Sequence, residues 1–264
     1  MTAPRPTSTS VGPPGERGPA KDHQGPLRGP QRPGARPARC DSRLALFDLD
    51  HTLLSGDTDV LWCEYLMQQG LLDSAAFASR NADMAMRYAD ASVTAQEFCD
   101  FYASTLAGRS IAEWRPVCER FLRDIVVPLI PAAAHALVES HRQQGDRLVL
   151  TTATNRVLTE LTARHLGIAD LLATEVELNS GRCTGRTLGT LNMREGKVTR
   201  LQSWLVEQGL PASLLAGAIF YSDSANDLPL LRAVAEPVVV DPDERLLAVA
   251  QALQWRVLRL ARRG

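Results

Sequence analysis

The sequence predicts an α/β fold in which a doubly wound parallel sheet carries an inserted helical segment. Three apolar runs, at 44–54, 147–154 and 218–222, have the composition of buried strands. Each run ends in acidic or hydroxyl residues, and stretches with helical spacing of apolar residues separate the runs. Ligands of open α/β sheets bind beyond the carboxyl ends of the strands, so we expect the functional residues at those ends.

The first run, LALFDLDHTLL (44–54), reads as one buried strand that ends in Asp48 and Asp50, followed by Thr52. Period-two alternation would point both carboxylates to the same side. Two carboxylates about 4 Å apart repel each other by roughly 4 kcal/mol at an effective dielectric near 20, so we expect a cation between them. Oxygen ligands of this kind suit Mg²⁺. A pair of solvated loop acids is the alternative reading of these two residues taken alone.

The second run, RLVLTTAT (147–154), places Thr152 at the tip of a strand, and Asn155 begins a helix. The Thr152 hydroxyl can donate to a phosphate oxygen, and the unpaired N–H groups of the first helical turn form an anion site. A simple helix-capping role is the alternative for such a threonine.

The segment LNMREGKVTRL (191–201) carries Lys197 early in a predicted helix. A lysine on such a helix is ordinarily a solvated surface residue. Here, however, an acidic cluster that must also receive a phosphate dianion needs positive charge beyond a single metal ion. The helix is predicted from the spacing of its apolar residues, Val198, Leu201, Leu205 and Val206.

The last segment, AIFYSDSANDLPLL (218–231), repeats the arrangement of the first. A strand at 218–222 is followed by Asp223, and then by Asn226 and Asp227 at the start of a helix. Asp223 can complete the metal site. Asp227 either takes part in the site or interacts with the positive end of the helix dipole.

These four segments occur in the order found in the haloacid dehalogenase (HAD) superfamily of phosphohydrolases, which the chain resembles over about residues 43–260. The resemblance implies a Rossmann-like core and a phosphatase that works through an aspartyl-phosphate. It assigns Asp48 as the nucleophile and Asp50 as the general acid/base. It also assigns Thr152 as the phosphate-binding hydroxyl and Lys197 as the group that neutralises charge.

The same resemblance implies Mg²⁺ as the cofactor. Its expected ligands are the carboxylate of Asp48, the main chain of Asp50 and the carboxylate of Asp223. We expect Asp227 to orient the ligands or their waters rather than to bind the metal directly.

About ninety residues separate the first two motifs, and they contain four helical patterns, near 58–69, 73–90, 94–107 and 110–125. We therefore expect a helical cap at 61–126 and an α/β core made of 43–60 and 127–264. This arrangement resembles subfamily IB of the superfamily, the phosphoserine-phosphatase branch. Three longer phrases resemble a bacterial group described as histidinol-phosphate phosphatase-like or phosphoserine phosphatase-like: TTATNRVLTELTARHLGI (151–168), GRTLGTLNMREGK (185–197) and FYSDSANDLPLL (220–231).

Two positions bear on the substrate. Asp57 stands where phosphoserine phosphatases carry a glutamate that grips the substrate's amino group, and Asp59 lies beside it. Tyr102 falls where those enzymes have a cap arginine for the substrate carboxylate, with Arg109 or Arg87 as alternatives. We therefore expect histidinol phosphate, with phosphoserine as the alternative. Asp57 and Asp59 are equally compatible with capping the first helix. The expected substrate-binding residues are Asp57, Thr152, Asn155 and Lys197.

Composition and charge limit the classes of partner and the cellular location that we expect. The chain has 264 residues and a formal net charge of −1, which gives no reason to expect nucleic-acid or anionic membrane partners. We expect a soluble, cytoplasmic protein whose partner is a small phosphorylated metabolite, and the oligomeric state stays open. Residues 1–42 are rich in Pro, Gly and Arg and are expected to be disordered.

Other functions are compatible with parts of the pattern. A phosphotransfer receiver also groups acids, a threonine and a lysine, but it has no helical insert behind its first strand. A phosphotransferase or phosphomutase, or a binding protein that kept the fold without catalysis, are more remote alternatives. No G-x-G-x-x-G motif follows a strand, which argues against a nicotinamide cofactor.

Overall fold

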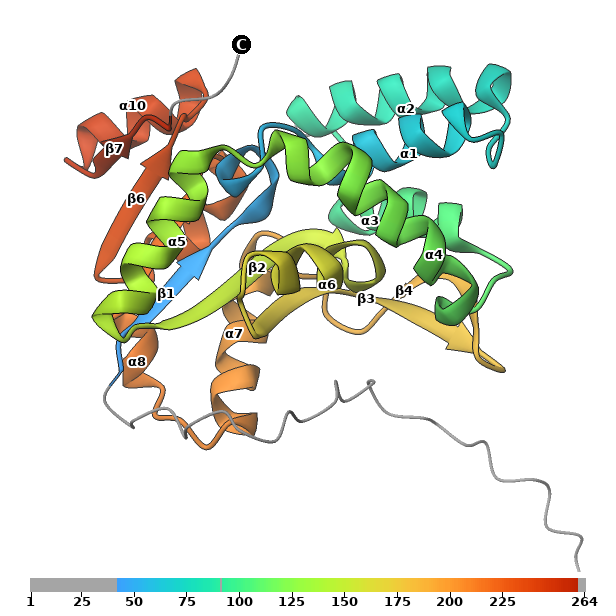
Figure 1. The fold of residues 1–264 in the computed structure, drawn as a ribbon. Coiled ribbons are helices and arrows are strands. Elements are labelled where there is room, and N and C mark those ends of the chain that lie inside the picture. The colour runs from blue at the N-terminus through green and yellow to red at the C-terminus, as the bar shows by residue number, and fades with distance from the viewer. Residues whose placement is uncertain (1–41, 91, 261–264) are drawn as a thin grey trace, which may run out of the picture. The chain divides into compact units, whose positions relative to one another are not determined.

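The computed structural model describes residues 42–90 and 92–260. The predicted N-terminal disorder falls on residues 1–42, which lie outside the described part apart from Ser42. A seven-stranded sheet forms the centre of this part, in the order β4-β3-β2-β1-β5-β6-β7 (Figure 1). The strands are β1 Leu44–Phe47, β2 Arg147–Asn155, β3 Asp170–Asn179, β4 Arg182–Leu188, β5 Ile219–Ser222, β6 Glu236–Val240 and β7 Arg256–Leu258.

All neighbouring strands are parallel except β3 and β4, which pair as an antiparallel hairpin. The chain moves from β1 outward through β2 and β3, then returns to the other side of β1 and continues through β5 and β6. The strand order therefore reverses at β1, and a crevice is expected beyond its carboxyl end. The predicted doubly wound α/β fold is confirmed.

Helices cover both faces of the sheet, as the side chains of β1 show. Ala45 and Phe47 point into one core, which is shared with α5 (Ala132–Gln144) and α6 (Arg156–His165). Leu44 and Leu46 point into a second core on the opposite face. The helices of that face are α7 Glu195–Glu207, α8 Ser213–Ala216, α9 Leu228–Leu231 and α10 Glu244–Ala252. Because both faces of β1 are buried, its sequence is apolar throughout.

Four helices lie between β1 and α5, one inside each of the predicted patterns: α1 Thr58–Gln68, α2 Ser74–Ala89, α3 Ala95–Ala103 and α4 Ile111–Phe121. Sequence signals set two of their starts. Thr94 with Glu97 and Ser110 with Glu113 form capping boxes at α3 and α4. Residues of α1 to α3 form a third apolar cluster that also takes in Met193 and Ala153 from the core.

The first strand is shorter than predicted. It ends at Phe47, and residues Leu49–Leu53 form a tight turn in which His51 has a left-handed backbone (φ 54°). Asp48 and Asp50 themselves keep an extended backbone (φ −73°, ψ 161° and φ −69°, ψ 132°), and the left-handed His51 follows them.

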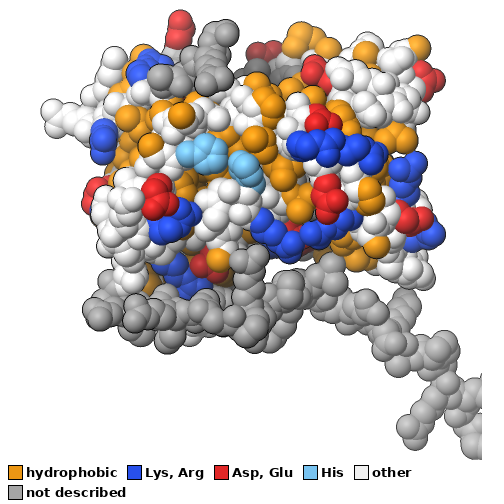
Figure 2. Space-filling view, viewed as in Figure 1, with side chains coloured by type: hydrophobic (Ala, Val, Ile, Leu, Met, Phe, Trp, Pro, Cys, Tyr) orange, Lys and Arg blue, Asp and Glu red, His pale blue; other side chains and the backbone are white. Residues whose placement is uncertain are grey.

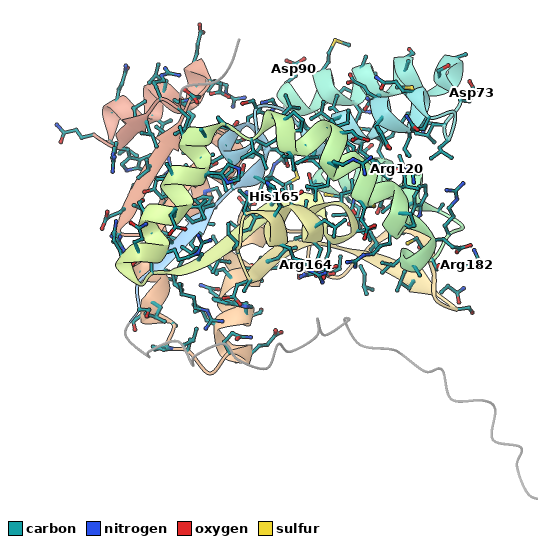
Figure 3. The ribbon with its side chains drawn as sticks, viewed as in Figure 1. Asp73, Asp90, Arg120, Arg164, His165 and Arg182 are labelled. Atoms are coloured by element: carbon teal, nitrogen blue, oxygen red, sulfur yellow. The ribbon has the colours of Figure 1, made fainter. Side chains whose placement is uncertain are left out.

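The surface visible in Figure 2 mixes basic and acidic side chains among apolar ones, and neither sign of charge covers it. Figure 3 labels charged residues on this surface, with Asp73 and Asp90 at the two ends of α2. Among the described residues, no single helix is long and apolar enough to cross a membrane. One pair, Ile111–Leu129 and Ala132–Gln144, meets the length and composition criteria together, but it is bent by 95°.

Candidate active site

A buried lysine joins two aspartates from different strand ends. The Nζ atom of Lys197 donates to Asp48 Oδ1 at 2.7 Å and to Asp227 Oδ2 at 2.7 Å. All three side chains are at least nine-tenths buried. The Ser222 hydroxyl also donates to Asp227 Oδ2, at 2.7 Å. Since Lys197 bonds only Oδ1 of Asp48, the second oxygen of that carboxylate remains available for other contacts.

Thr52 joins the other Asp48 oxygen to the last motif. Its hydroxyl lies 3.2 Å from Asp48 Oδ2 and 2.8 Å from Asp223 Oδ1, and it accepts from the Asp223 N–H at 3.1 Å. This fully buried threonine therefore holds the ends of β1 and β5 in register. It also keeps the Asp48 and Asp223 carboxylates next to each other.

Asp50 receives donors on both carboxylate oxygens. The Thr58 N–H donates to Oδ1 at 2.7 Å, and the Thr58 hydroxyl donates to the same oxygen. The hydroxyls of Thr152 and Thr154 lie 3.2 Å and 2.9 Å from Oδ2. The orientation of the Asp50 carboxyl is thus fixed by α1 on one side and β2 on the other.

The aspartates and the lysine of this network open onto one cleft between the end of the sheet and the helices α1 and α3. The described residues that line it are Asp48, Asp50, His51, Asp57, Asp59, Phe98, Ala153, Thr154, Met193, Lys197, Asp223, Ser224, Asn226 and Asp227. No arginine is among them. Six of the fourteen are aspartates: two come from the first motif, two from α1 or its N-cap, and two from the last motif. The cleft therefore combines a strongly acidic lining with a small apolar wall.

The position of Asp57 is compatible both with substrate binding and with capping of the first helix. The residue lines the cleft, and its Oδ1 accepts from the Val60 N–H at 3.0 Å as the N-cap of α1. Asp59 is buried in the first turn of α1, and its Oδ2 lies 3.1 Å from the Thr154 hydroxyl.

The loop before α7 places Lys197. Asn192 is fully buried, and its Nδ2 donates to Thr151 Oγ1, to the Thr152 carbonyl and to the Leu172 carbonyl at 2.9–3.0 Å. A side chain at Gly196 would put its Cβ 2.0 Å from the Leu191 carbonyl oxygen, so only glycine fits there. These contacts fix the start of α7 against β2 and β3.

Several other predicted site residues lie outside the described cleft lining. Thr152 is fully buried beneath it and reaches Asp50 rather than open space. Asn155 is the N-cap of α6, where its Oδ1 accepts from the Leu158 N–H. In both cases the polar side chain pairs with a carboxylate or backbone group inside the protein.

The three residues considered for a carboxylate clamp also lie elsewhere. Tyr102 is buried among aromatic side chains, 4.9 Å from the ring of Phe98. The Arg109 guanidinium stacks over Trp114, with 4.6 Å between its centre and the ring. Arg87 pairs with Glu97 at 3.8 Å.

The electrostatics of the cleft favour a bound cation. Burial raises the pKa of Asp48 well above its ordinary value, although Lys197 opposes this, and the charges of Asp227, Asp223 and Asp50 raise it further. Burial also raises the pKa of Asp223 to about 7. Lys197 pairs with Asp48 and Asp227, and no second lysine or arginine among the described lining residues faces the Asp50 and Asp223 carboxyl groups.

The donor set fits Mg²⁺ in particular. The described residues contain no cage of three or more His, Cys, Asp or Glu side chains. Mg²⁺ does not need one, because it binds through one or two carboxylates and completes its shell with water and phosphate. The carboxylates of Asp48 and Asp223, held together by Thr52, meet that requirement.

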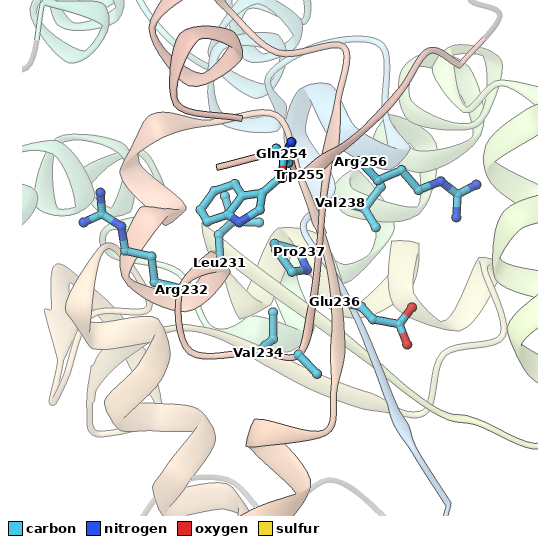
Figure 4. Close-up of a pocket in the computed structure, with 10 residues that line it drawn as sticks. Leu231, Arg232, Val234, Glu236, Pro237, Val238, Gln254, Trp255 and Arg256 are labelled. Carbon is cyan, nitrogen blue, oxygen red and sulfur yellow. The ribbon is translucent and has the colours of Figure 1, made fainter. Parts of the chain in front are cut away.

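A larger groove of about 440 Å³ lies at the β6–β7 edge of the sheet, lined by Arg232, Pro237, Trp255 and Arg256 among others (Figure 4). None of the predicted site residues lines it. Its size therefore does not make it the reaction site.

Sequence reasoning did not single out Thr58, Thr154, Asn192 or Ser222. Each is a polar side chain in or next to a motif, and Thr154, Asn192 and Ser222 each lie inside one of the three quoted phrases. Their partners depend on turns whose geometry the sequence pattern does not give.

Comparison with known proteins gives one consistent result. The family model of haloacid dehalogenase-like hydrolases matches residues 45–232. A histidinol-phosphatase of Neisseria meningitidis is 38% identical over 216 residues, covering 81% of this chain and 97% of that protein. A phosphoserine phosphatase of Mycobacterium tuberculosis is 30% identical over 231 residues, covering 83% of this chain and 72% of that protein.

Solved structures agree with the fold. A Bordetella pertussis protein of unknown function is 42% identical, with a TM-score of 0.78 over 82% of this chain and 98% of that one. A substrate-bound phosphoserine phosphatase is similar with a TM-score of 0.59 over 82% and 92% of the two chains. At 15% identity, that second likeness shows the fold alone.

Proposed function

Because the chain belongs to the haloacid dehalogenase-like hydrolase family and is a phosphatase of that family, we propose that it is a magnesium-dependent phosphomonoesterase acting through an aspartyl-phosphate on Asp48. The observation that carries the proposal is the pairing of Asp48 with Lys197 in a cleft that also contains Asp50 and Asp223. A buried carboxylate with one oxygen fixed by a cation is suited to in-line attack on a phosphoryl group.

The residues of the chain account for each proton and bond. An Asp48 oxygen forms a bond to phosphorus while the ester P–O bond breaks, and protonated Asp50 gives its proton to the leaving alkoxide. Asp50 then takes a proton from water, which attacks the phosphoryl group and releases Asp48 and inorganic phosphate. Lys197 remains paired with Asp48 and Asp227, so its charge stays next to the transferred group. Mg²⁺, when held by Asp48, Asp223 and the main chain of Asp50, would supply further charge neutralisation on the phosphoryl oxygens.

For the substrate we propose histidinol phosphate. Asp57 offers a carboxylate for an ammonium group, and no arginine lines the described cleft to hold a substrate carboxylate. The 38% identical relative is named a histidinol-phosphatase. Phosphoserine phosphatase is the second candidate, since one relative at 30% identity carries that name. A phosphomutase or a non-catalytic binding protein has no observation in its favour.

We further propose that α1 to α4 act as the predicted cap over the site, because α1 and α3 supply Asp59 and Phe98 to its lining. The cytoplasmic location stays a prediction, as does the binding of a small phosphorylated metabolite rather than a nucleic acid or a membrane.

The direct test compares phosphate release from L-histidinol phosphate and L-phosphoserine at saturating Mg²⁺. We expect a higher kcat/KM for histidinol phosphate, and we expect Asp48→Asn to lose activity on both, by about 10³-fold or more. The exposed Asp90→Asn is the matched control and should keep full activity. A clear preference for phosphoserine would overturn the substrate, and activity retained in Asp48→Asn would overturn the mechanism.

A further inference from the structure

One buried carboxylate oxygen in the cleft has no hydrogen-bond partner in the part of the chain that the structure describes. Asp59 is only 4% exposed and lines the cleft, yet its Oδ1 bonds no other described residue. Buried polar atoms are nearly always paired, because leaving one unpaired costs about 1–3 kcal/mol and more for a charged group. An orphaned oxygen at this position therefore needs an explanation.

The other Asp59 oxygen is only partly satisfied. Its single neighbour is the Thr154 hydroxyl at 3.1 Å, and the same hydroxyl lies 2.9 Å from Asp50 Oδ2. A threonine hydroxyl has one hydrogen to donate, so it serves one carboxylate at a time. Asp59 thus has the acceptor capacity of a whole carboxyl group and at most one side-chain donor among the described residues.

The surroundings indicate what kind of group would complete it. Phe98, Ala153 and Met193 form the apolar part of the cleft lining, and Asp57 lies two residues before Asp59 in the chain. Lys197 is occupied by Asp48 and Asp227. Burial raises the pKa of Asp59 well above its ordinary value, and the neighbouring charges of Asp57 and Asp50 raise it further. A ligand group placed here meets carboxylates and apolar surface, which favours an N–H donor on an organic framework.

We propose that Asp59 is a specificity-determining residue whose unpaired Oδ1 accepts an N–H donor of the substrate, separate from the donor that Asp57 receives. The substrate class is a phosphate monoester whose alcohol carries two distinct nitrogen donors, such as an ammonium and a heteroaromatic N–H, and no carboxylate. The proposal rests on the proposed function and narrows it.

The assignment of separate donors follows from the capping role of Asp57. One oxygen of Asp57 already accepts the Val60 N–H at the start of α1, so its free capacity is smaller than that of Asp59. An ammonium at Asp57 therefore leaves Asp59 Oδ1 still unpaired. A second donor removes that penalty, whereas a substrate without one leaves the carboxylate oxygen buried and unsatisfied.

Two probes that differ in the second donor test this. L-histidinol phosphate carries an ammonium and an imidazole N–H, and L-phenylalaninol phosphate carries the ammonium with a ring that has no N–H. We expect the wild-type protein to prefer the first by about tenfold or more in kcat/KM. Asp59→Leu should abolish most of that preference, because the residue that reads the second donor is gone.

The exposed Glu64→Gln on the same helix is the matched control, since it removes a charge from α1 outside the cleft. Asp59→Glu keeps the carboxylate and serves as a second variant in case Asp59→Leu folds poorly. We expect Asp59→Glu to retain part of the preference for L-histidinol phosphate. If Asp59→Leu lowers kcat/KM for both probes by the same factor, so that the preference for L-histidinol phosphate stays intact, the proposal is overturned. Failure of the proposed function would look different, since the wild-type protein itself would then be inactive or prefer phosphoserine.

Discussion

At the residue scale, the central feature is Lys197 between two buried aspartates. Three side chains taken out of water are costly unless they are paired with good geometry, and the two 2.7 Å contacts supply that pairing. The attraction of Asp227 and Asp48 raises the pKa of Lys197 despite the opposing effect of burial, so the lysine stays charged. The charge of Lys197 therefore stabilises the fold by pairing with two buried aspartates, and it also lies where it can interact with a phosphoryl group.

Removing this charge should destabilise the protein in a pH-dependent way. Lys197→Met leaves Asp48 and Asp227 without their counter-ion, which typically costs about 3–5 kcal/mol for a buried pair. We expect a loss of that size in the free energy of unfolding at pH 8, measured by urea denaturation with a chelator present.

The loss in free energy of unfolding caused by Lys197→Met should be smaller at pH 6 than at pH 8. The pKa of Asp48 is raised above 3.8 in the folded protein, so the folded state binds more protons than the unfolded state at intermediate pH. Stability then rises as pH falls, because a protonated carboxyl no longer needs the lysine. The exposed Arg245→Met should show neither effect. An equal loss at both pH values would contradict this electrostatic explanation.

At the element scale, the site depends on short turns at the ends of β1, β2 and β5 and on the loop before α7. The fit of that loop is tight at Gly196, where a Cβ would meet the Leu191 carbonyl oxygen at 2.0 Å. The clash involves backbone, so it cannot be relieved by rotating a side chain. The start of α7 would have to shift, and Lys197 would move with it.

We therefore expect Gly196→Ala to lower kcat by about tenfold or more, since displacements near 1 Å can cost about 10²-fold. Gly70→Ala is a useful control, because no atom lies within 4 Å of the Cβ it would add, although its positive φ carries some strain. Gly70→Ala should lose some stability through backbone strain but keep its activity. Full activity in Gly196→Ala would show that Lys197 does not need this loop conformation.

The sequence predicted much at this scale. The four helical patterns between the first two motifs each contain a helix, because apolar spacing and two capping boxes set them locally. The predicted end of the first strand was wrong, since a left-handed residue at His51 has no clear sequence signal. Tyr102 was placed through a loosely patterned helix, and the pattern could not show that its ring packs behind Phe98.

At the scale of the whole molecule, the sheet brings together residues far apart in the chain. Lys197 and Asp48 are separated by 149 positions, and Asp223 and Thr52 by 171, yet both pairs are in contact. Parallel strands whose order reverses at β1 make this possible, because their carboxyl ends share one edge. The sequence predicted this convergence from strand ends. It did not predict that Thr152 would bond Asp50 beneath the cleft, because that depends on how tightly the strand tips pack.

The measurement that tests the account most directly is the location of phosphate on the protein during turnover. The protein is mixed with ³²P-labelled L-histidinol phosphate and Mg²⁺, quenched in acid, and digested for peptide mapping. We predict label on the peptide that contains Asp48, lost when the sample is made alkaline and absent in Asp48→Asn. Turnover with no protein-bound label in acid-quenched samples, or label on a different residue, would contradict the assignment of Asp48 as the nucleophile.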